Sequence, residues 1–219
     1  MKRIHVNFIF ILFVSFSLQM AFATDYPKEW WKPFPKEAAE PWEILPQEAK
    51  PGEVILSKRT ALGILSNFAL TPFMLDGKKY ASVEGFWQMM KYPDLELIND
   101  PRNNPAFIWK FSRDDVSQLS GFEAKEAGNA TKENYQKLGI FWISYQGIKM
   151  EYKGKDQEVH YQLIFRATQE KINQNKAAKD ILLSTGDLIL KPDHHQEPDA
   201  PPAYRYYDIL MKIRSEFIN

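Results

Sequence analysis

Large apolar side chains recur at helical spacing in the middle of the chain. Positions three, four and seven residues apart form one stripe of a short helix: Val83, Phe86, Trp87 and Met90. A helix face this rich in large apolar residues is typical of a buried helix. Glu84, Gln88 and Lys91 repeat the same spacing and form a second, polar stripe. That stripe faces either water or a cavity. Burial of the helix favours a cavity, because buried charges need a partner or a function.

A β-hairpin is expected just before this helix. Residues 73–75 and 79–80 flank Asp76-Gly77, a dipeptide that readily supplies the positive φ angles of a two-residue type I′ turn. Ser82 is placed to cap the helix. Pro93 is expected to end it, because a proline biases the preceding residue, Tyr92, out of helical geometry.

The rest of the chain reads as mainly helical. Helices are predicted over residues 106–111, 114–119, 121–138 with a break at Gly128, 157–173, 176–184 and 204–217. Short strands are predicted over residues 54–57, 141–145, 149–152 and 188–190, and the second and third of these could pair as a hairpin through Gln146-Gly147. The order of elements shows no βαβ alternation. The predicted fold is therefore mainly α, a compact single helical domain with one or two small β-hairpins.

The N-terminus reads as a secretory signal peptide. Lys2 and Arg3 precede an apolar run, and Ala21-Phe22-Ala23 supplies the small residues that a signal peptidase reads. The run is shorter than the roughly 20 residues that span a bilayer, and no later stretch reads as a membrane span. Cleavage after Ala23 predicts an exported protein, periplasmic or secreted. The predicted divisions are residues 1–23 as the signal peptide, 24–57 as an arm and 58–219 as the domain.

The arm is rich in proline and aromatic residues. Six prolines within residues 24–57 disfavour helix and central strand. Trp30, Trp31, Phe34 and Trp42 lie among them, which is unusual for a flexible linker. We expect the arm to pack across the domain in extended form. The alternative is an aromatic patch that contacts a wall, lipid or protein partner.

Composition excludes several classes of site. The chain has no cysteine, so disulfides, thiolate metal sites and a cysteine nucleophile are absent. It has 28 basic and 28 acidic residues. Because nucleic-acid binding usually demands a basic face, no stable nucleic-acid partner is expected.

An ordered set of short motifs covers residues 65–91. In chain order they are Leu65-Ser66-Asn67-Phe68, Asp76-Gly77, Ser82-x-Glu84 and Trp87-Gln88-x-x-Lys91. This pattern resembles the signature of the NADAR (YbiA-like) family, which reads roughly SNF, a short apolar hairpin with DGK, then S-x-E-x-x-x-Q-x-x-K. A second similarity covers residues 166–185 and 208–214. The resemblance implies a compact helical fold with its cleft around the signature helix.

The resemblance also implies an N-glycosidase-type hydrolase acting on a ribosylated small molecule. Described members act on phosphoribosylated riboflavin intermediates and on ADP-ribose attached to guanine. Such a bond breaks through an oxocarbenium-like state stabilised by negative charge, while the departing nitrogen takes a proton. Glu84 is the candidate catalytic carboxylate, and its place near a helix N-terminus is expected to favour its ionised form. Lys91, about 10 Å along the helix, is a candidate nucleophile or a cation that steers a phosphate.

Further motif residues are candidate substrate contacts. Ser66 and Gln88 belong to the motif, Asn67 could hold a ribose hydroxyl, and Phe68 or Trp87 could stack on a base. Each role has a structural alternative. Asn67 could cap its own turn, and the two aromatic side chains could belong to the core.

One departure from the family pattern concerns the side that holds the leaving group. The family commonly has a late acidic loop with Trp-Gly, whereas this chain has Asp187 and then Asp193-His194-His195, without tryptophan. Asp187, Asp193 and His194 are candidate substrate contacts, and this loop could supply the proton donor because histidine titrates near neutral pH. Adjacent side chains rarely bind one ion together, so no metal and no cofactor is expected.

Two other functions fit the same residues. The chain could be a non-catalytic exported module that binds nucleotide or ADP-ribose. It could also be an interaction protein that contacts an envelope component through its Trp-rich arm. No Ser-His-Asp spacing, phosphate loop or dinucleotide fingerprint is present.

Overall fold

The computed structural model describes residues 25–218, which are mainly helical with small two-stranded sheets, as predicted. The helices are α1 (Val83–Met89), α2 (Arg113–Ser117), α3 (Gly121–Asn129), α4 (Lys132–Leu138), α5 (Gln157–Gln174), α6 (Lys176–Ser184) and α7 (Tyr206–Ile218). The strands are β1 (Glu53–Ile55), β2 (Phe73–Leu75), β3 (Lys78–Tyr80), β4 (Ile143–Tyr145), β5 (Ile148–Met150) and β6 (Ile189–Lys191). The signal-peptide prediction lies outside the described residues.

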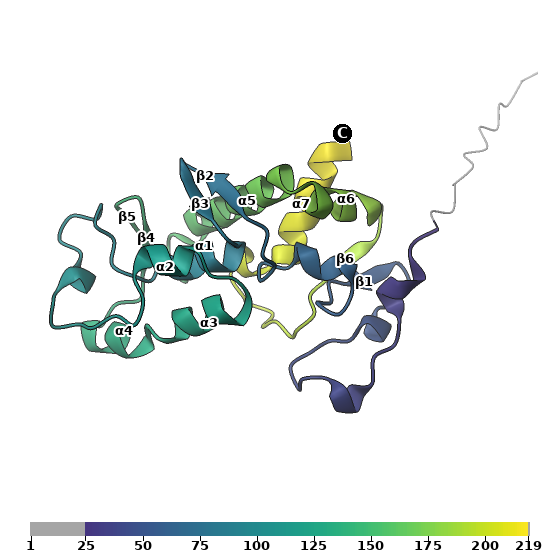
Figure 1. Ribbon diagram of the computed structural model, residues 1–219, viewed down its shortest axis with the longest axis horizontal. Coiled ribbons are helices and arrows are strands. Elements are labelled where there is room, and N and C mark those ends of the chain that lie inside the picture. Colours follow the sequence, from purple (N-terminus) through teal and green to yellow (C-terminus); the bar gives the residue numbers. More distant parts are fainter. Residues whose placement is uncertain (1–24, 219) are drawn as a thin grey trace, which may run out of the picture.

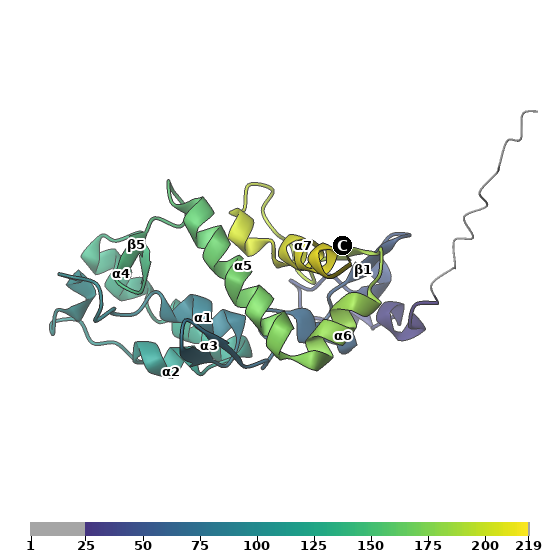
Figure 2. The same cartoon turned by 90° about the horizontal axis from the view of Figure 1, so that it is seen from above.

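Helix α5 crosses the centre of the molecule, with α1 on one side and α7 on the other (Figure 2). The segment before β1 and the β1–β6 pair lie at one end, and α4 with β4 and β5 at the other (Figure 1). The core includes Phe73, Tyr80, Phe86 and Tyr145, whose rings meet edge to face or tilted at centroid distances of 4.8–6.2 Å. Such pairs add to the hydrophobic burial that holds α1 in place.

Both predicted hairpins are confirmed. Asp76 and Gly77 have φ angles of 49° and 77° between β2 and β3, and Gln146 and Gly147 have 49° and 71° between β4 and β5. Positive φ at both central residues is what a type I′ turn requires. The parallel pairing of β1 with β6 was not predicted, because these strands are more than 130 residues apart and neither carries a local pairing signal.

Two helix predictions are wrong. Residues 106–111 form turns, because the Asn104 side chain accepts a hydrogen bond from the Ala106 amide at 2.9 Å and the Asn104 carbonyl accepts one from Phe107. The break in residues 121–138 falls between Asn129 and Lys132 and not at Gly128, which is helical.

Helix α1 is fixed at both ends. The Ser82 hydroxyl accepts from the Gly85 amide at 2.9 Å, as a cap should. Beyond Met89, the buried Arg102 guanidinium donates to the Met90 carbonyl at 2.9 Å and pairs with Asp100. The helix therefore ends before Lys91, which lies in the turn that follows.

The segment from residue 25 to β1 packs against the core. Trp30 is 1% exposed, and Trp31 Nε1 donates to the Glu53 carbonyl at 2.9 Å. Further along, the Ile44 amide donates to the Asp193 carbonyl at 2.8 Å. Within residues 25–218, no helix is both long and apolar enough to cross a bilayer.

Candidate functional site

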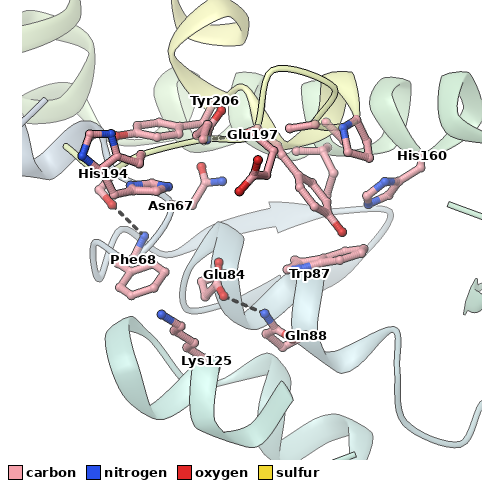
Figure 3. A pocket seen from close by; sticks show the side chains of 18 of the residues that line it. Asn67, Phe68, Glu84, Trp87, Gln88, Lys125, His160, His194, Glu197 and Tyr206 are labelled. Atoms are coloured by element: carbon pink, nitrogen blue, oxygen red, sulfur yellow. Dashed lines mark hydrogen bonds between the residues drawn. The ribbon is translucent and has the colours of Figure 1, made fainter. Parts of the chain in front are cut away.

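A cavity of about 890 Å³ opens beside α1. Its walls come from α1, the loop of residues 66–68, α3, the first half of α5 and the loop of residues 194–204, with Trp42 from the arm. Figure 3 shows Glu84 near the centre, with Phe68 and His194 toward one side and Trp87 and His160 toward the other. The volume is in the range of small-molecule binding sites.

Close packing holds Glu84 in the cavity wall. Its amide donates to the Asn67 carbonyl at 3.0 Å, which joins α1 to the loop of residues 66–68. A Cβ on Gly85 would lie 2.4 Å from the Leu119 carbonyl oxygen, so only glycine allows α1 to approach so closely there. The Glu84 side chain is left 8% exposed, on the wall of the cavity.

Gln88 is the hydrogen-bond donor to the Glu84 carboxylate. Its Nε2 lies 2.7 Å from Glu84 Oε1 (Figure 3). Gln88 Oε1 has no hydrogen-bond partner within the described chain. A Cβ on Gly128 would lie 1.7 Å from this oxygen, so the glycine of α3 leaves the space that the amide occupies.

Burial is the main influence on the pKa of Glu84. Desolvation raises the pKa of this carboxyl, and it outweighs the lowering by the Gln88 hydrogen bond and by the charges of Lys91, Lys125 and His194. The expectation that the helix N-terminus would favour the ionised form is therefore wrong. The net shift favours the protonated form, because the buried carboxyl loses its water.

The buried Lys171 on α5 holds the loop of residues 66–68 in place. Lys171 Nζ on α5 donates to the Ser66 carbonyl at 2.6 Å, and the Ser66 hydroxyl accepts from the Phe68 amide at 3.2 Å. These bonds place the Asn67 and Phe68 side chains in the cavity wall. Asn67 Oδ1 is buried and lacks a hydrogen-bond partner among residues 25–218.

Trp87 forms a wall together with His160. Their ring centroids are 4.4 Å apart, and Tyr152 and Tyr204 lie at 5.1 and 6.0 Å from Trp87. His160 is 1% exposed, and neither of its ring nitrogens has a partner in the described part of the chain. Burial lowers the pKa of His160 to about 3, so the ring is neutral and one nitrogen can donate while the other accepts.

Lys91 does not line the cavity. Its ammonium lies 5.4 Å from the Trp87 ring centroid, and burial lowers its pKa to about 8, although the charge of Glu84 partly opposes this shift. The amine is therefore more easily deprotonated than an exposed lysine. Both of its predicted roles require the side chain to reach past the Trp87 ring, and they stay predictions.

Of the predicted contacts Asp187, Asp193 and His194, only His194 lines the cavity. His194 lines the cavity and stacks on Tyr206, with ring planes 5° apart. Asp193 lies behind it, buried, and pairs with Lys58 and with His194 Nδ1. Burial acts to raise the Asp193 pKa, but these partners outweigh it and lower the pKa, which disfavours Asp193 as a proton donor. Asp187 is exposed, pairs with the Tyr26 hydroxyl and does not line the cavity.

Unpaired buried polar atoms concentrate at this cavity. Within the described residues there are six such side-chain atoms, and five belong to residues of the cavity wall: Asn67, Gln88, His160 with both nitrogens, and Gln196. A buried polar group without a partner costs about 1–3 kcal/mol. Their concentration beside Glu84 makes this cavity the candidate site for a polar ligand.

Several wall residues were not predicted. Trp42, Lys58, Phe122, Lys125 and Tyr204 line the cavity, yet they come from four separate stretches, none with a local motif. His160 lies within α5, and no local motif around it signals a site. Among residues 25–218 no group of three or more His, Cys, Asp or Glu residues is arranged to hold a metal ion.

Comparisons with known proteins find distant similarity. No family model matches the chain. The chain is 27% identical over 127 residues to an uncharacterised 17.1 kDa protein from the Gp30-rIII intergenic region of Enterobacteria phage T4; the alignment covers 58% of this chain and 70% of the phage protein. The structure resembles an NMR structure of the E. coli protein YbiA with a TM-score of 0.47 and 20% identity, over 76% of this chain and 86% of YbiA.

Proposed function

We propose that the protein is a hydrolase that cleaves the N-glycosidic bond of a ribosylated or ADP-ribosylated small molecule or base. One observation carries the proposal: Glu84, with a raised pKa, lies in a cavity wall among buried polar atoms that have no partner within residues 25–218. A buried carboxyl with a raised pKa holds its proton more tightly than an exposed one, which suits general acid catalysis. The ordered motif of residues 65–91 supports membership of the NADAR family as part of the same proposal.

In the proposed reaction Glu84 first donates a proton and later takes one back. The C1′–N bond breaks and its electrons pass to the departing nitrogen, which takes the proton of the Glu84 carboxyl. The carboxylate left behind stabilises the oxocarbenium-like sugar. Water then forms the new C–O bond at C1′ and returns one proton to Glu84. Gln88 donates to the carboxylate and keeps it oriented toward the sugar.

Lys91 belongs to the proposal as an alternative nucleophile to water. Its lowered pKa, about 8, leaves part of the amine unprotonated at neutral pH. The amine would bond to C1′ as the nitrogen leaves and would lose one proton. Water would then attack C1′ of this adduct and release the amine. This path requires the Lys91 side chain to turn from the Trp87 ring into the cavity.

The substitution Glu84→Gln tests the proposal. Glutamine has the same shape and keeps an oxygen that can accept from Gln88, but it cannot deliver a proton to the leaving nitrogen. Release of free base is measured over a panel of ribosylated nucleosides, nicotinamide dinucleotide and ADP-ribosylated guanosine. We expect turnover to fall by about 10²–10⁴-fold with ligand affinity retained. Glu133→Gln, at an exposed acid on α4, is the matched control and should leave turnover unchanged.

A wild-type protein that binds members of the panel but releases no base would contradict the hydrolase proposal. That result would favour the second candidate, a non-catalytic module that binds ribosylated ligands, because unpaired buried polar atoms suit a binding site as well as an active site.

We further propose that the protein is exported after cleavage behind Ala23, supported by the apolar run and the small residues that precede the cut.

A further inference from the structure

We infer that the arm completes a second binding subsite at the mouth of the cavity, one that holds an aromatic base carrying a phosphate group. This mouth subsite consists of Trp42, Phe68, Phe122, Lys58 and Lys125, all of which line the cavity. The inference rests on the proposed function, because the base would belong to the same ligand whose sugar lies at Glu84. It assigns a role to an arm residue outside the motif of residues 65–91.

Three aromatic rings form the apolar part of the mouth subsite. Phe122 meets Trp42 at a centroid distance of 6.1 Å and Phe68 at 5.3 Å, both edge to face. Trp42 remains 38% exposed and Phe122 52% exposed. Large aromatic side chains that stay open to solvent beside a cavity offer flat surfaces on which a base can stack.

Two lysines line the same subsite, and Lys125 supplies most of its net positive charge because the Lys58 ammonium is already paired with Asp193. Lys58 Nζ lies 5.4 Å from the Trp42 ring centroid and 5.2 Å from that of Phe68. Lys125 Nζ lies 5.9 Å from the Phe122 centroid, and its charge acts on the pKa of Glu84. Flat apolar rings next to two ammonium groups match a base joined to a phosphate better than they match an uncharged aromatic ligand.

The arm is fixed where it carries Trp42. Glu43 accepts from Arg59 Nε at 2.9 Å and from Nη2 at 2.6 Å, and the Arg59 guanidinium lies 3.7 Å from the Phe34 ring centroid. Glu43 also forms a β-bridge with His194. These contacts join Glu43, the residue after Trp42, to Arg59 and to His194. The Trp42 ring is therefore positioned before a ligand binds, which reduces the entropy cost of binding.

There is room for a ring beside Trp42. A second hollow of about 480 Å³ shares Trp42, Lys58 and Phe122 with the main cavity. In Figure 3, Glu84 lies between Phe68 on one side and the Trp87–His160 wall on the other. A ligand with its base on Trp42 and its phosphates near the two lysines would therefore place a following ribose toward Glu84.

Equilibrium binding of two probes tests the inference without any requirement for turnover. ADP-ribose carries a base, two phosphates and the ribose, whereas ribose 5-phosphate lacks the base. We expect Trp42→Ala to weaken ADP-ribose binding by about 5- to 150-fold, the range for loss of one base–aromatic stack, and to leave ribose 5-phosphate binding unchanged. Trp42→Phe should restore most of the ADP-ribose affinity, because the ring is retained.

Phe141→Ala is the matched control, since Phe141 is an exposed aromatic side chain that does not line the cavity; it should bind both probes like the wild type. Equal ADP-ribose affinity in the wild type and Trp42→Ala would overturn the inference, as would no ADP-ribose binding by the wild type. Parallel weakening of both probes in Trp42→Ala, unrepaired by Trp42→Phe, would also overturn it. Trp42-dependent binding without base release would uphold the subsite and refute only the hydrolase.

Discussion

Lys171 is a buried charge beneath the candidate site, and its removal is expected to stabilise the protein. The side chain is 0% exposed, and its one hydrogen bond in the described chain goes to the Ser66 carbonyl, not to a carboxylate. Burial lowers the pKa of Lys171 to about 7 from the ordinary 10.5. Folding therefore has to withdraw an ammonium from water at neutral pH.

The pKa shift gives the size of this effect. A change from 10.5 to about 7 corresponds to about 5 kcal/mol, at 1.36 kcal/mol for each unit. Between these two pH values the unfolded chain binds the proton more tightly than the folded chain. The free energy of unfolding contributed by this residue therefore increases as pH rises from about 7 to 10.5. Near pH 7, roughly 4 kcal/mol of the penalty is still present.

The substitution Lys171→Met removes the charge and keeps an unbranched apolar chain. It also leaves the Ser66 carbonyl without its donor, which costs about 1–3 kcal/mol. We expect a net gain of roughly 1–3 kcal/mol at pH 7. Near pH 10 we expect a net loss, because the neutral wild-type amine still donates to Ser66. Urea unfolding at several pH values between 6.5 and 10, followed by circular dichroism, measures the difference.

Lys132→Met is the control, because Lys132 is exposed on α4 and its removal should leave the pH dependence of unfolding unchanged. Wild type and Lys171→Met with parallel stability curves would refute the reasoning, since a shared slope means that the lysine ionises alike in both states. A variant that is less stable by the same amount at every pH would refute it too. In that case packing, and not ionisation, governs the residue.

Two further substitutions test the geometry around Glu84. Gly128→Ala should lower turnover because the new Cβ displaces Gln88, with a stability change within about 1 kcal/mol because the helix gains propensity. The control Gly154→Ala, where a Cβ meets atoms only at 3.5 Å, should preserve turnover. Equal turnover rates in the two variants would contradict the argument. If the Lys91 amine is the nucleophile, Lys91→Arg should abolish turnover as fully as Lys91→Met, because arginine keeps only the charge. Steady-state assays measure both variants. Activity retained by Lys91→Arg would assign Lys91 to phosphate steering.

Local signals in the sequence predicted the parts of the fold that depend on few neighbours. The Asp76-Gly77 and Gln146-Gly147 turns need only positive φ angles, and the Ser82 cap needs only the first turn of α1. The end of α1 depends on more than Pro93. Arg102 binds the carbonyl of Met90 from 12 residues away, a contact that no local pattern announces. The helix is accordingly shorter than its apolar periodicity suggests.

The candidate site divides in the same way. Glu84, Asn67 and Phe68 were predicted because they lie in one continuous motif, and the structure places all three in the cavity wall. Trp42 and His160 reach the same wall from more than 40 residues upstream and 70 downstream of Glu84, through tertiary packing alone. The raised pKa of Glu84 was missed for a related reason, since its largest cause is burial, which depends on tertiary packing.

Buried polar groups are paired beyond the C-terminal end of α1 but not on its cavity side, and this contrast marks the cavity side as the candidate site. Beyond the C-terminal end, the buried Arg102 is paired with Asp100 and donates to Met90 and Ser144, so its charge is satisfied by the protein itself. On the cavity side, His160 and Gln88 have buried atoms without a hydrogen-bond partner in the described part of the chain. Native proteins retain few such groups unless another molecule satisfies them. The uncompensated cost around Glu84 is therefore the physical ground for expecting a polar ligand there.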